Sequence, residues 1–243
     1  ANGNYTSGEV YTIDKTAPTV TINQAGAQTD PASSFPILYD VVFSEAVTGF
    51  TSADVTISGT ATGVSLTTSG SGTTYEIQIT AASTNGTIIP SINASGAADS
   101  AGNLNAASTG TDSTVTLDNT APSVSSIVRA SSNPSNSGTV NFTVTFSENV
   151  SGVDTADFTL TITGVSGASV SSVNQVTASQ YTVAVATGSN SGTIRLDLTD
   201  DDTIADGAGN KLGGTGAANG NYTLGETYTI DKTAPTVTIN QAG

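Results

Sequence analysis

The sequence contains no cysteine and no histidine. The missing cysteine excludes disulfides, cysteine-ligated zinc and thiol catalysis. The missing histidine excludes imidazole bases and histidine-ligated metals. No run approaches the roughly 18 apolar residues of a transmembrane helix, so we expect no membrane insertion in this segment. A carboxylate pair could still act as acid and base, but no apolar pocket or long helical frame is visible, and we predict that the chain is not an enzyme.

Basic residues are scarce, with 5 Lys+Arg against 20 Asp+Glu and a formal net charge of -15. Nucleic acids and anionic membranes are bound through lysine and arginine, so neither is expected as a partner. Two interpretations stay open for the acidic residues. They form a solvated surface, or they gather around a hard cation such as Ca²⁺.

The first 26 residues return at the end of the chain. ANGNYTSGEVYTIDKTAPTVTINQAG, residues 1–26, recurs as residues 218–243 with two differences, Ser7/Leu224 and Val10/Thr227. Repetition in register over this length indicates a tandem array. We therefore expect neighbouring repeats of the same chain as partners, and further copies in a filament are a second possibility.

A shorter period lies inside the long one. The string TAP follows Asp14, Asp118 and Asp231, and these aspartates are 104 and 113 residues apart. Both steps have the size of an immunoglobulin-like domain. We predict domains at residues 14–118 and 119–231. Residues 1–13 are then the last strand of a preceding domain, and residues 232–243 the first strand of a following one.

Apolar residues alternate within short segments bounded by turn residues, as in PILYDVVF at residues 36–43. This period predicts half-buried strands, and helix signals are absent. The fold class is therefore all-β, as tandem seven-stranded Ig-like antiparallel β-sandwiches in an extended array. Pro90 falls in a central strand, where we expect a bulge or a local break. The predicted strands are residues 18–23, 36–44, 54–59, 63–68, 74–81, 86–92 and 113–118, then 123–128, 139–147, 157–163, 168–174, 180–187, 192–198 and 226–231.

Three motifs recur in both halves: D-[KN]-T-A-P-[TS]-V at each junction, F-S-E-x-V-[TS]-G from Phe43 and Phe146, and A-D-x-A-G-N from Ala98 and Ala205. Through them the chain resembles the bacterial Ig-like repeats of large surface adhesins and biofilm-associated proteins. The resemblance implies an extracellular, repetitive stalk on the bacterial cell surface, often stiffened by Ca²⁺ between domains.

The strand order of such a sandwich brings the junction, the end of the second strand and the last loop to one pole. Carboxylates and amides from these places would converge there, as oxygen ligands for Ca²⁺. The candidate metal ligands are Asp14, Glu45, Asp54, Asp99 and Asn103 in the first domain, Asp118, Glu148, Asp157, Asp206 and Asn210 in the second, and Asp231 at the last junction.

Asp200, Asp201 and Asp202 lie in a longer loop and could join this group, or form a solvated acidic loop. The same alternative holds for all the candidates, because aspartate before a turn is common in Thr/Gly-rich β proteins.

The repeats favour a structural segment of an extracellular adhesin stalk or surface filament, with Ca²⁺ at the junctions. The alternative function is a carbohydrate- or protein-binding Ig-like module at the cell surface. The absence of tryptophan, and tyrosine and phenylalanine at inward strand positions, count against that alternative.

Overall fold

The computed structural model describes residues 7–241. The chain divides into two compact units, Ala1–Asn119 and Thr120–Gly243. Of the predicted terminal strands, residues 1–6 and 242–243 lie outside the described residues. Among residues 7–241, no helix has the length and apolar character needed to cross a membrane.

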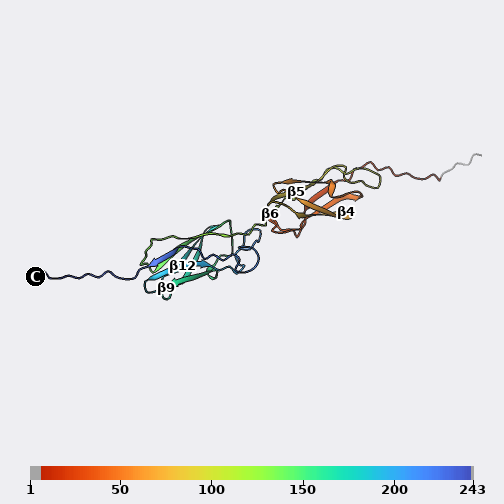
Figure 1. The fold of residues 1–243 in the computed structure, drawn as a ribbon. Helices are drawn as coiled ribbons and strands as arrows, with labels where there is room; N and C mark the ends of the chain where they lie inside the picture. Colours follow the sequence, from red (N-terminus) through yellow and green to blue (C-terminus); the bar gives the residue numbers. More distant parts are fainter. Residues whose placement is uncertain (1–6, 242–243) are drawn as a thin grey trace, which may run out of the picture. The chain divides into compact units, whose positions relative to one another are not determined.

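The first unit consists of two sheets with antiparallel strand pairing, coloured red to yellow-green in Figure 1. One sheet has the order β1-β2-β4 and the other β3-β5-β6. A 3-10 turn, η1 at Ser52–Asp54, precedes β3. The strands are β1 Val20–Gln24, β2 Ile37–Val47, β3 Val55–Gly59, β4 Ser65–Ala81, β5 Gly86–Ile92 and β6 Val115–Leu117.

The second unit repeats this plan, with one sheet of order β10-β11-β8-β7 and another of order β13-β12-β9. Its 3-10 turn, η2 at Thr155–Asp157, again precedes the third strand of the unit. The strands are β7 Val124–Arg129, β8 Thr139–Phe146, β9 Phe158–Thr163, β10 Ser169–Thr177, β11 Gln180–Ala186, β12 Gly192–Leu198 and β13 Thr227–Ile230.

Alternating side chains build the core of the first unit. In β2 the side chains of Ile37, Tyr39 and Val41 are each 0% exposed, whereas Val42, the next residue in sequence, is 47% exposed. The cluster that these residues join also contains Ile88 and other residues of the β3-β5-β6 sheet. Two sheets thus bury their inner faces against each other, and the predicted all-β sandwich is confirmed.

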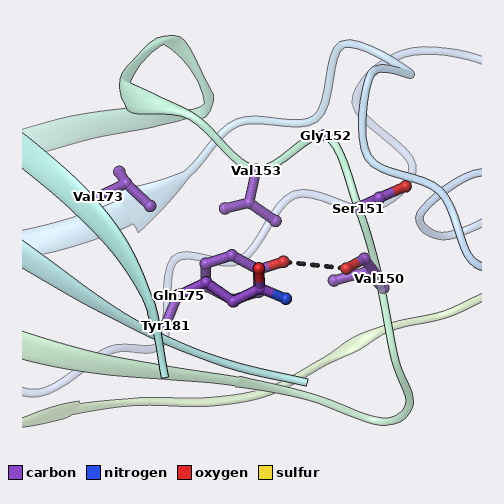
Figure 2. Close-up of a pocket in the computed structure, with 7 residues that line it drawn as sticks. All are labelled: Val150, Ser151, Gly152, Val153, Val173, Gln175 and Tyr181. Atoms are coloured by element: carbon purple, nitrogen blue, oxygen red, sulfur yellow. Dashed lines mark hydrogen bonds between the residues drawn. The ribbon is translucent and has the colours of Figure 1, made fainter. Parts of the chain in front are cut away.

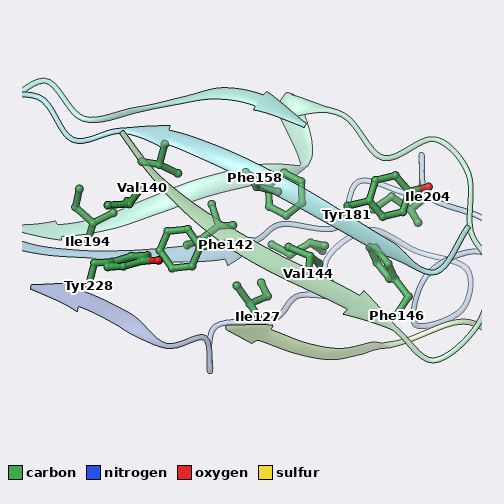
Figure 3. Packing of buried hydrophobic residues seen from close by; sticks show 14 of the residues in the cluster. Ile127, Val140, Phe142, Val144, Phe146, Phe158, Tyr181, Ile194, Ile204 and Tyr228 are labelled. Carbon is green, nitrogen blue, oxygen red and sulfur yellow. The ribbon is translucent and has the colours of Figure 1, made fainter. Parts of the chain in front are cut away.

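The core of the second unit is closed by aromatic contacts between its sheets (Figure 3). The rings of Phe142 in β8 and Tyr228 in β13 lie edge to face, with centroids 5.0 Å apart. Such a pair adds about 0.5–1.5 kcal/mol to the free energy gained from burial. The last strand of the unit therefore contributes directly to its stability.

One strand element contains a turn. We predicted strands at residues 63–68 and 74–81; β4 spans residues 65–81 and folds back between them, so that Thr80 Oγ1 donates to Ser65 O over 3.3 Å. The backbone turns at Gly70 and Gly72, which have φ angles of 114° and 69°. A Cβ atom on Gly70 would lie 2.4 Å from the carbonyl oxygen of Thr74, so the returning chain needs glycine there.

The prediction of a break at Pro90 is wrong. Pro90 pairs with Ile57 in an unbroken register between β3 and β5. The amide of Ile92, two residues on, points to the other edge of β5, where it donates to Ser108 Oγ over 2.8 Å. The nitrogen of Pro90 points to this edge too, and the pairing with β6 ends at Ile88. No ladder hydrogen bond is lost, so the strand accepts proline.

Candidate metal centre

Three carboxylates of the first unit converge at one place. Asp14 precedes β1, Glu45 lies near the end of β2, and Asp99 lies in the loop after β5. One carboxylate oxygen from each lies within 4.8 Å of the others. We predicted all three residues as metal ligands from the sequence, and in the structure their carboxylates lie close together.

Asp99 is fixed by the loop in which it lies, residues 98–103. Its Oδ1 accepts the backbone N–H groups of Ala101 and Asn103, at 2.8 and 2.9 Å. Its Oδ2 accepts Asn103 Nδ2 at 2.8 Å. Gly102 has a φ of 89°, which the tight turn requires. The A-D-x-A-G-N motif thus encodes a loop that holds one carboxylate in a defined position.

Asn103 also connects this loop to the start of the unit. Its Nδ2 donates to the backbone carbonyl oxygen of Asp14 over 3.2 Å. Asp14 Oδ1 in turn accepts the backbone N–H of Thr16 at 2.9 Å. The side chain of Asn103 therefore orients both Asp99 and the segment that carries Asp14.

The electrostatics of the group are uneven. The pKa of Glu45 is raised above its ordinary value, first by loss of solvation and then by the negative charges of Asp99 and Asp14. The pKa of Asp99 is lowered, chiefly by the hydrogen bond from the Asn103 side chain. Asp99 is thus held as a carboxylate at neutral pH, and its charge disfavours ionisation of Glu45.

The donor set fits a hard cation. All three side chains offer oxygen, and no nitrogen or sulfur ligand exists in a chain without histidine or cysteine. Ca²⁺ takes six to eight oxygen ligands from carboxylates, carbonyls and water, in a flexible shell. A divalent cation would also offset the negative charges of Asp99 and Asp14, which add to the effect of desolvation on the pKa of Glu45.

Asp54 and Asp157, which we predicted as ligands, are engaged by the 3-10 turns. Asp54 Oδ2 accepts the backbone N–H and the hydroxyl of Thr51, at 2.8 and 2.9 Å. Asp157 is 1% exposed and accepts Asp154 N–H at 2.7 Å and Thr203 Oγ1 at 3.0 Å. Burial raises the pKa of Asp157. Neither residue belongs to a group of close carboxylates among the described residues.

The second unit contains the same loop. Asp206 Oδ1 accepts the N–H groups of Ala208 and Asn210, at 2.8 and 2.9 Å, and its Oδ2 accepts Asn210 Nδ2 at 2.8 Å. Glu148 follows β8, and its carboxylate oxygen lies within 4.8 Å of one from Asp206. The distances match those of Asp99 closely, so the motif forms the same structure twice.

The junction aspartates Asp118 and Asp231 form hydrogen bonds within the units whose ends they mark. Asp118 donates its N–H to Ala32 O at 2.9 Å, and its Oδ1 accepts Asn85 Nδ2 at 2.8 Å. Asp231 donates its N–H to Ser135 O at 2.9 Å. Hydrogen bonds from the backbone and side chain of Thr233 hold the pKa of Asp231 below its ordinary value. Each predicted junction begins from an anchored aspartate.

The carboxylates of Asp200 and Asp202 accept hydrogen bonds from backbone N–H groups later in the chain. Asp200 is 3% exposed, and its Oδ2 accepts the N–H of Gly220 at 3.1 Å. Asp202 accepts Gly216 N–H with both oxygens. Asp200 is buried, so the loop is not uniformly solvated, and these residues are outside the close carboxylate groups of residues 7–241.

Asn105 is a positioning residue that the sequence did not reveal. It is 2% exposed, and its Oδ1 accepts Ala97 N–H at 2.8 Å while Nδ2 donates to Asn93 O at 3.0 Å. These bonds secure the chain on both sides of the Asp99 loop. Leu212, which is 0% exposed, stands at the equivalent place of the second unit. The motif is the same up to Asn103 and Asn210, so it carries no signal for this residue.

Comparison with solved structures gives three likenesses of low identity. FdeC, an adhesin of Escherichia coli, is 16% identical with a TM-score of 0.36 over 92% of this chain and 66% of its own. InvD of Yersinia pseudotuberculosis is 13% identical with a TM-score of 0.40 over 92% and 60%. The D00-D0 domain of intimin is 13% identical with a TM-score of 0.34 over 87% and 99%. The chain thus spans less than two thirds of the FdeC and InvD chains.

No curated protein matches the sequence. One family model does, that of a bacterial Ig-like domain, and its match covers residues 14–116. These residues contain all six strands of the first unit, from β1 almost to the end of β6, and the Asp14, Glu45 and Asp99 group. Residues 14–116 therefore belong to the bacterial Ig-like domain family.

Proposed function

We propose that this chain is a structural, non-enzymatic segment of a bacterial surface adhesin stalk or filament, in which Ig-like domains follow one another and Ca²⁺ stiffens their junctions. In such arrays each unit contacts mainly its neighbours, and repetition supplies reach. The membership of residues 14–116 in the bacterial Ig-like family supports the extracellular setting.

The observation that carries this proposal is a contrast between identical residues. Val20 and Ile22 in β1 are each 2% exposed, whereas Val237 and Ile239 in the second copy of that sequence are 86% and 88% exposed. The apolar side chains that are buried in β1 are thus exposed in the second copy of the same sequence. A further sandwich like the first unit would bury it.

The opposite end shows the same contrast. Tyr228 and Ile230 in β13 are 0% and 1% exposed, whereas their equivalents Tyr11 and Ile13 are 84% and 78% exposed. Burying a large apolar side chain stabilises a fold by about 1.5–3 kcal/mol. Residues 1–13 and 232–243 therefore suit strands of neighbouring Ig-like domains.

The calcium part of the proposal rests on the group of Asp14, Glu45 and Asp99. An ion there would connect the segment before β1 to β2 and to the Asp99 loop, and so restrain that segment. The sequence equivalents in the second unit, Glu148, Asp206 and Asn210, would contribute to a second site of the same type. Asp231 would begin a third, with the domain that follows.

The test is thermal unfolding of the chain with Ca²⁺ and with a chelator, together with small-angle scattering. Binding to the folded state alone raises the midpoint, by an amount that grows with ligand concentration. We expect a higher midpoint with Ca²⁺ and a narrower distribution of interatomic distances. Asp99→Asn should remove most of the effect of the first site.

Asp40→Asn is the matched control, because Asp40 is an exposed carboxylate in β2 outside the group. It should leave the response to Ca²⁺ intact. An unchanged midpoint and distance distribution in the unsubstituted chain would contradict the calcium proposal. A fused third domain that left Val237 and Ile239 exposed would contradict the array.

A further inference from the structure

The two units provide an internal comparison of one corner of the sandwich. In the first unit Tyr75 donates its hydroxyl hydrogen to Val47 O over 3.0 Å. In the second, Tyr181 donates to Val150 O over 2.9 Å. The segments are equivalent, since F-S-E-A-V-T-G-F ends at Phe50 and F-S-E-N-V-S-G-V ends at Val153. The hydrogen bond of both tyrosines is thus the same, and among the three positions at which the segments differ, the last exchanges a large ring for a small side chain.

Phe50 fills this corner in the first unit. Its ring is edge to face with that of Tyr75, with centroids 5.1 Å apart, and with that of Phe43 at 5.7 Å. The side chain is 7% exposed. The rings of Phe43, Phe50 and Tyr75 therefore pack together near Val47, at the end of β2.

Val153 leaves the corner of the second unit open. A hollow of about 270 Å³ lies beside it, and Figure 2 shows Tyr181, Val173 and the turn around Gly152 at its walls. Phe146 and Tyr181 still form the edge-to-face pair, with centroids 5.8 Å apart. The second unit has Phe158 where the first has Val55, yet Phe158 does not line the hollow. The second unit therefore lacks a ring equivalent to that of Phe50, and the hollow lies beside Val153, which stands at the same position.

We propose that this hollow is a binding site for a small molecule with a single aromatic ring. Sites for drug-sized ligands have volumes of about 300–1,000 Å³. The hollow is smaller than these sites, and its volume suits a ligand with one ring. The ring takes the position that Phe50 has in the first unit, against the edge of Tyr181. Aromatic rings favour this geometry over other apolar groups of similar size.

The ligand carries a polar substituent. Ser151 and Gln175 contribute polar groups to the lining, and the hollow opens to solvent beside them. A hydroxyl group on the ring can stay hydrated or bond there while the ring is buried. Phenol is therefore a suitable probe, and cyclohexanol is the matched ring without aromatic character.

The experiment is a titration of the full chain with phenol, followed by ¹H–¹⁵N correlation spectra. We expect saturable shifts at residues 150–153 and 173–181 and none at residues 47–50. Cyclohexanol should give weaker shifts at the same signals. Val153→Phe places a ring in the hollow, so it should abolish the phenol shifts while the spectrum stays dispersed.

Phe50→Val is the complementary variant, since it opens the equivalent corner of the first unit. It should create a second set of phenol shifts at residues 47–50 and near Tyr75. Binding that persists in Val153→Phe, or shifts spread evenly over both units, would overturn the proposal. So would the absence of saturable shifts at residues 150–153 in the unsubstituted chain.

Discussion

Tyr39 of β2 donates its hydroxyl hydrogen to the carbonyl oxygen of Ile88 in β5 over 2.9 Å, across the core between the two sheets of the first unit. Burial raises the pKa of the Tyr39 hydroxyl, with a further contribution from the charge of Asp30. The hydroxyl therefore stays protonated throughout the neutral range, and the bond is present wherever the unit is folded.

Tyr39→Phe should destabilise the first unit by about 1–2 kcal/mol, because the Ile88 carbonyl loses its side-chain partner inside the core. Denaturant unfolding monitored by signals of the first unit measures the change. Tyr11→Phe is the control, because Tyr11 is 84% exposed, and it should change little. Equal effects of the two substitutions would show that the bond between the sheets contributes nothing.

Glu45→Gln should have opposite effects in the absence and presence of Ca²⁺. Without the ion it removes a charge next to Asp99 and Asp14, and the raised pKa of Glu45 shows that this charge is unfavourable. The midpoint in chelator should rise. The gain on adding Ca²⁺ should shrink, because a carboxylate ligand is lost. A calcium response of unchanged size would exclude Glu45 as a ligand.

Asp157→Asn should stabilise the second unit at pH 7 and have little effect near pH 4. Burial holds the pKa of Asp157 above its value in the unfolded chain, which is about 3.9. The folded state then binds the proton more tightly, so this stabilising contribution is full at low pH and declines as pH rises through the folded pKa. An asparagine carries no charge, and its one oxygen can still accept the Asp154 N–H. Its NH2 group can donate to Thr203 Oγ1, because the Thr203 hydroxyl can donate to Asp201 Oδ1 instead of to residue 157.

Unfolding midpoints of Asp157→Asn and the unsubstituted chain between pH 4 and pH 7 test this. Asp54→Asn, at the equivalent place of the more exposed turn in the first unit, is the control. A stabilisation by Asp157→Asn that does not vary with pH would assign the effect to packing.

Asn103→Ala should raise the pKa of Asp99 towards the ordinary value. The side-chain hydrogen bond from Asn103 is the largest cause of the lowered pKa. Folding stability that this lowered pKa supplies is present at neutral pH and is lost as pH falls through the folded pKa. A ¹³C titration of the carboxyl signal measures the shift. Ser100→Ala, an exposed change in the same loop, should leave the titration unaltered.

Much of the fold follows from the alternation of apolar residues. The four inward residues of β2 could be named from the sequence because a strand has a period of two. The error at Pro90 arose because the sequence does not tell where β6 ends, and that end decides which edge of β5 needs a donor. The turn within β4, in contrast, depends on positive φ angles at Gly70 and Gly72.

The candidate site was predictable in part. Strand order alone places Asp14, Glu45 and Asp99 at one pole, and the structure brings them within 4.8 Å. Strand order does not distinguish these residues from Asp54, another aspartate that was predicted as a ligand. The carboxylate of Asp54 instead accepts the N–H of Thr51. That distinction depends on a 3-10 turn of three residues, which is too short to give a periodic signal. The role of Asn105 depends on packing that only one of the two loops has.

The pairing of β12 with β13 has a consequence for synthesis. Gly192 pairs with Ile230, and Tyr228 of β13 contacts Phe142 and donates to Asn141 O over 2.8 Å. A ribosome or a secretion pore releases the chain in order, so the second unit cannot complete its core until residue 230 has emerged. Until then Phe142 of β8 lacks the ring of Tyr228 that packs against it. Folding of this unit is therefore timed by its final strand, and each domain of an array would close one at a time behind the advancing chain.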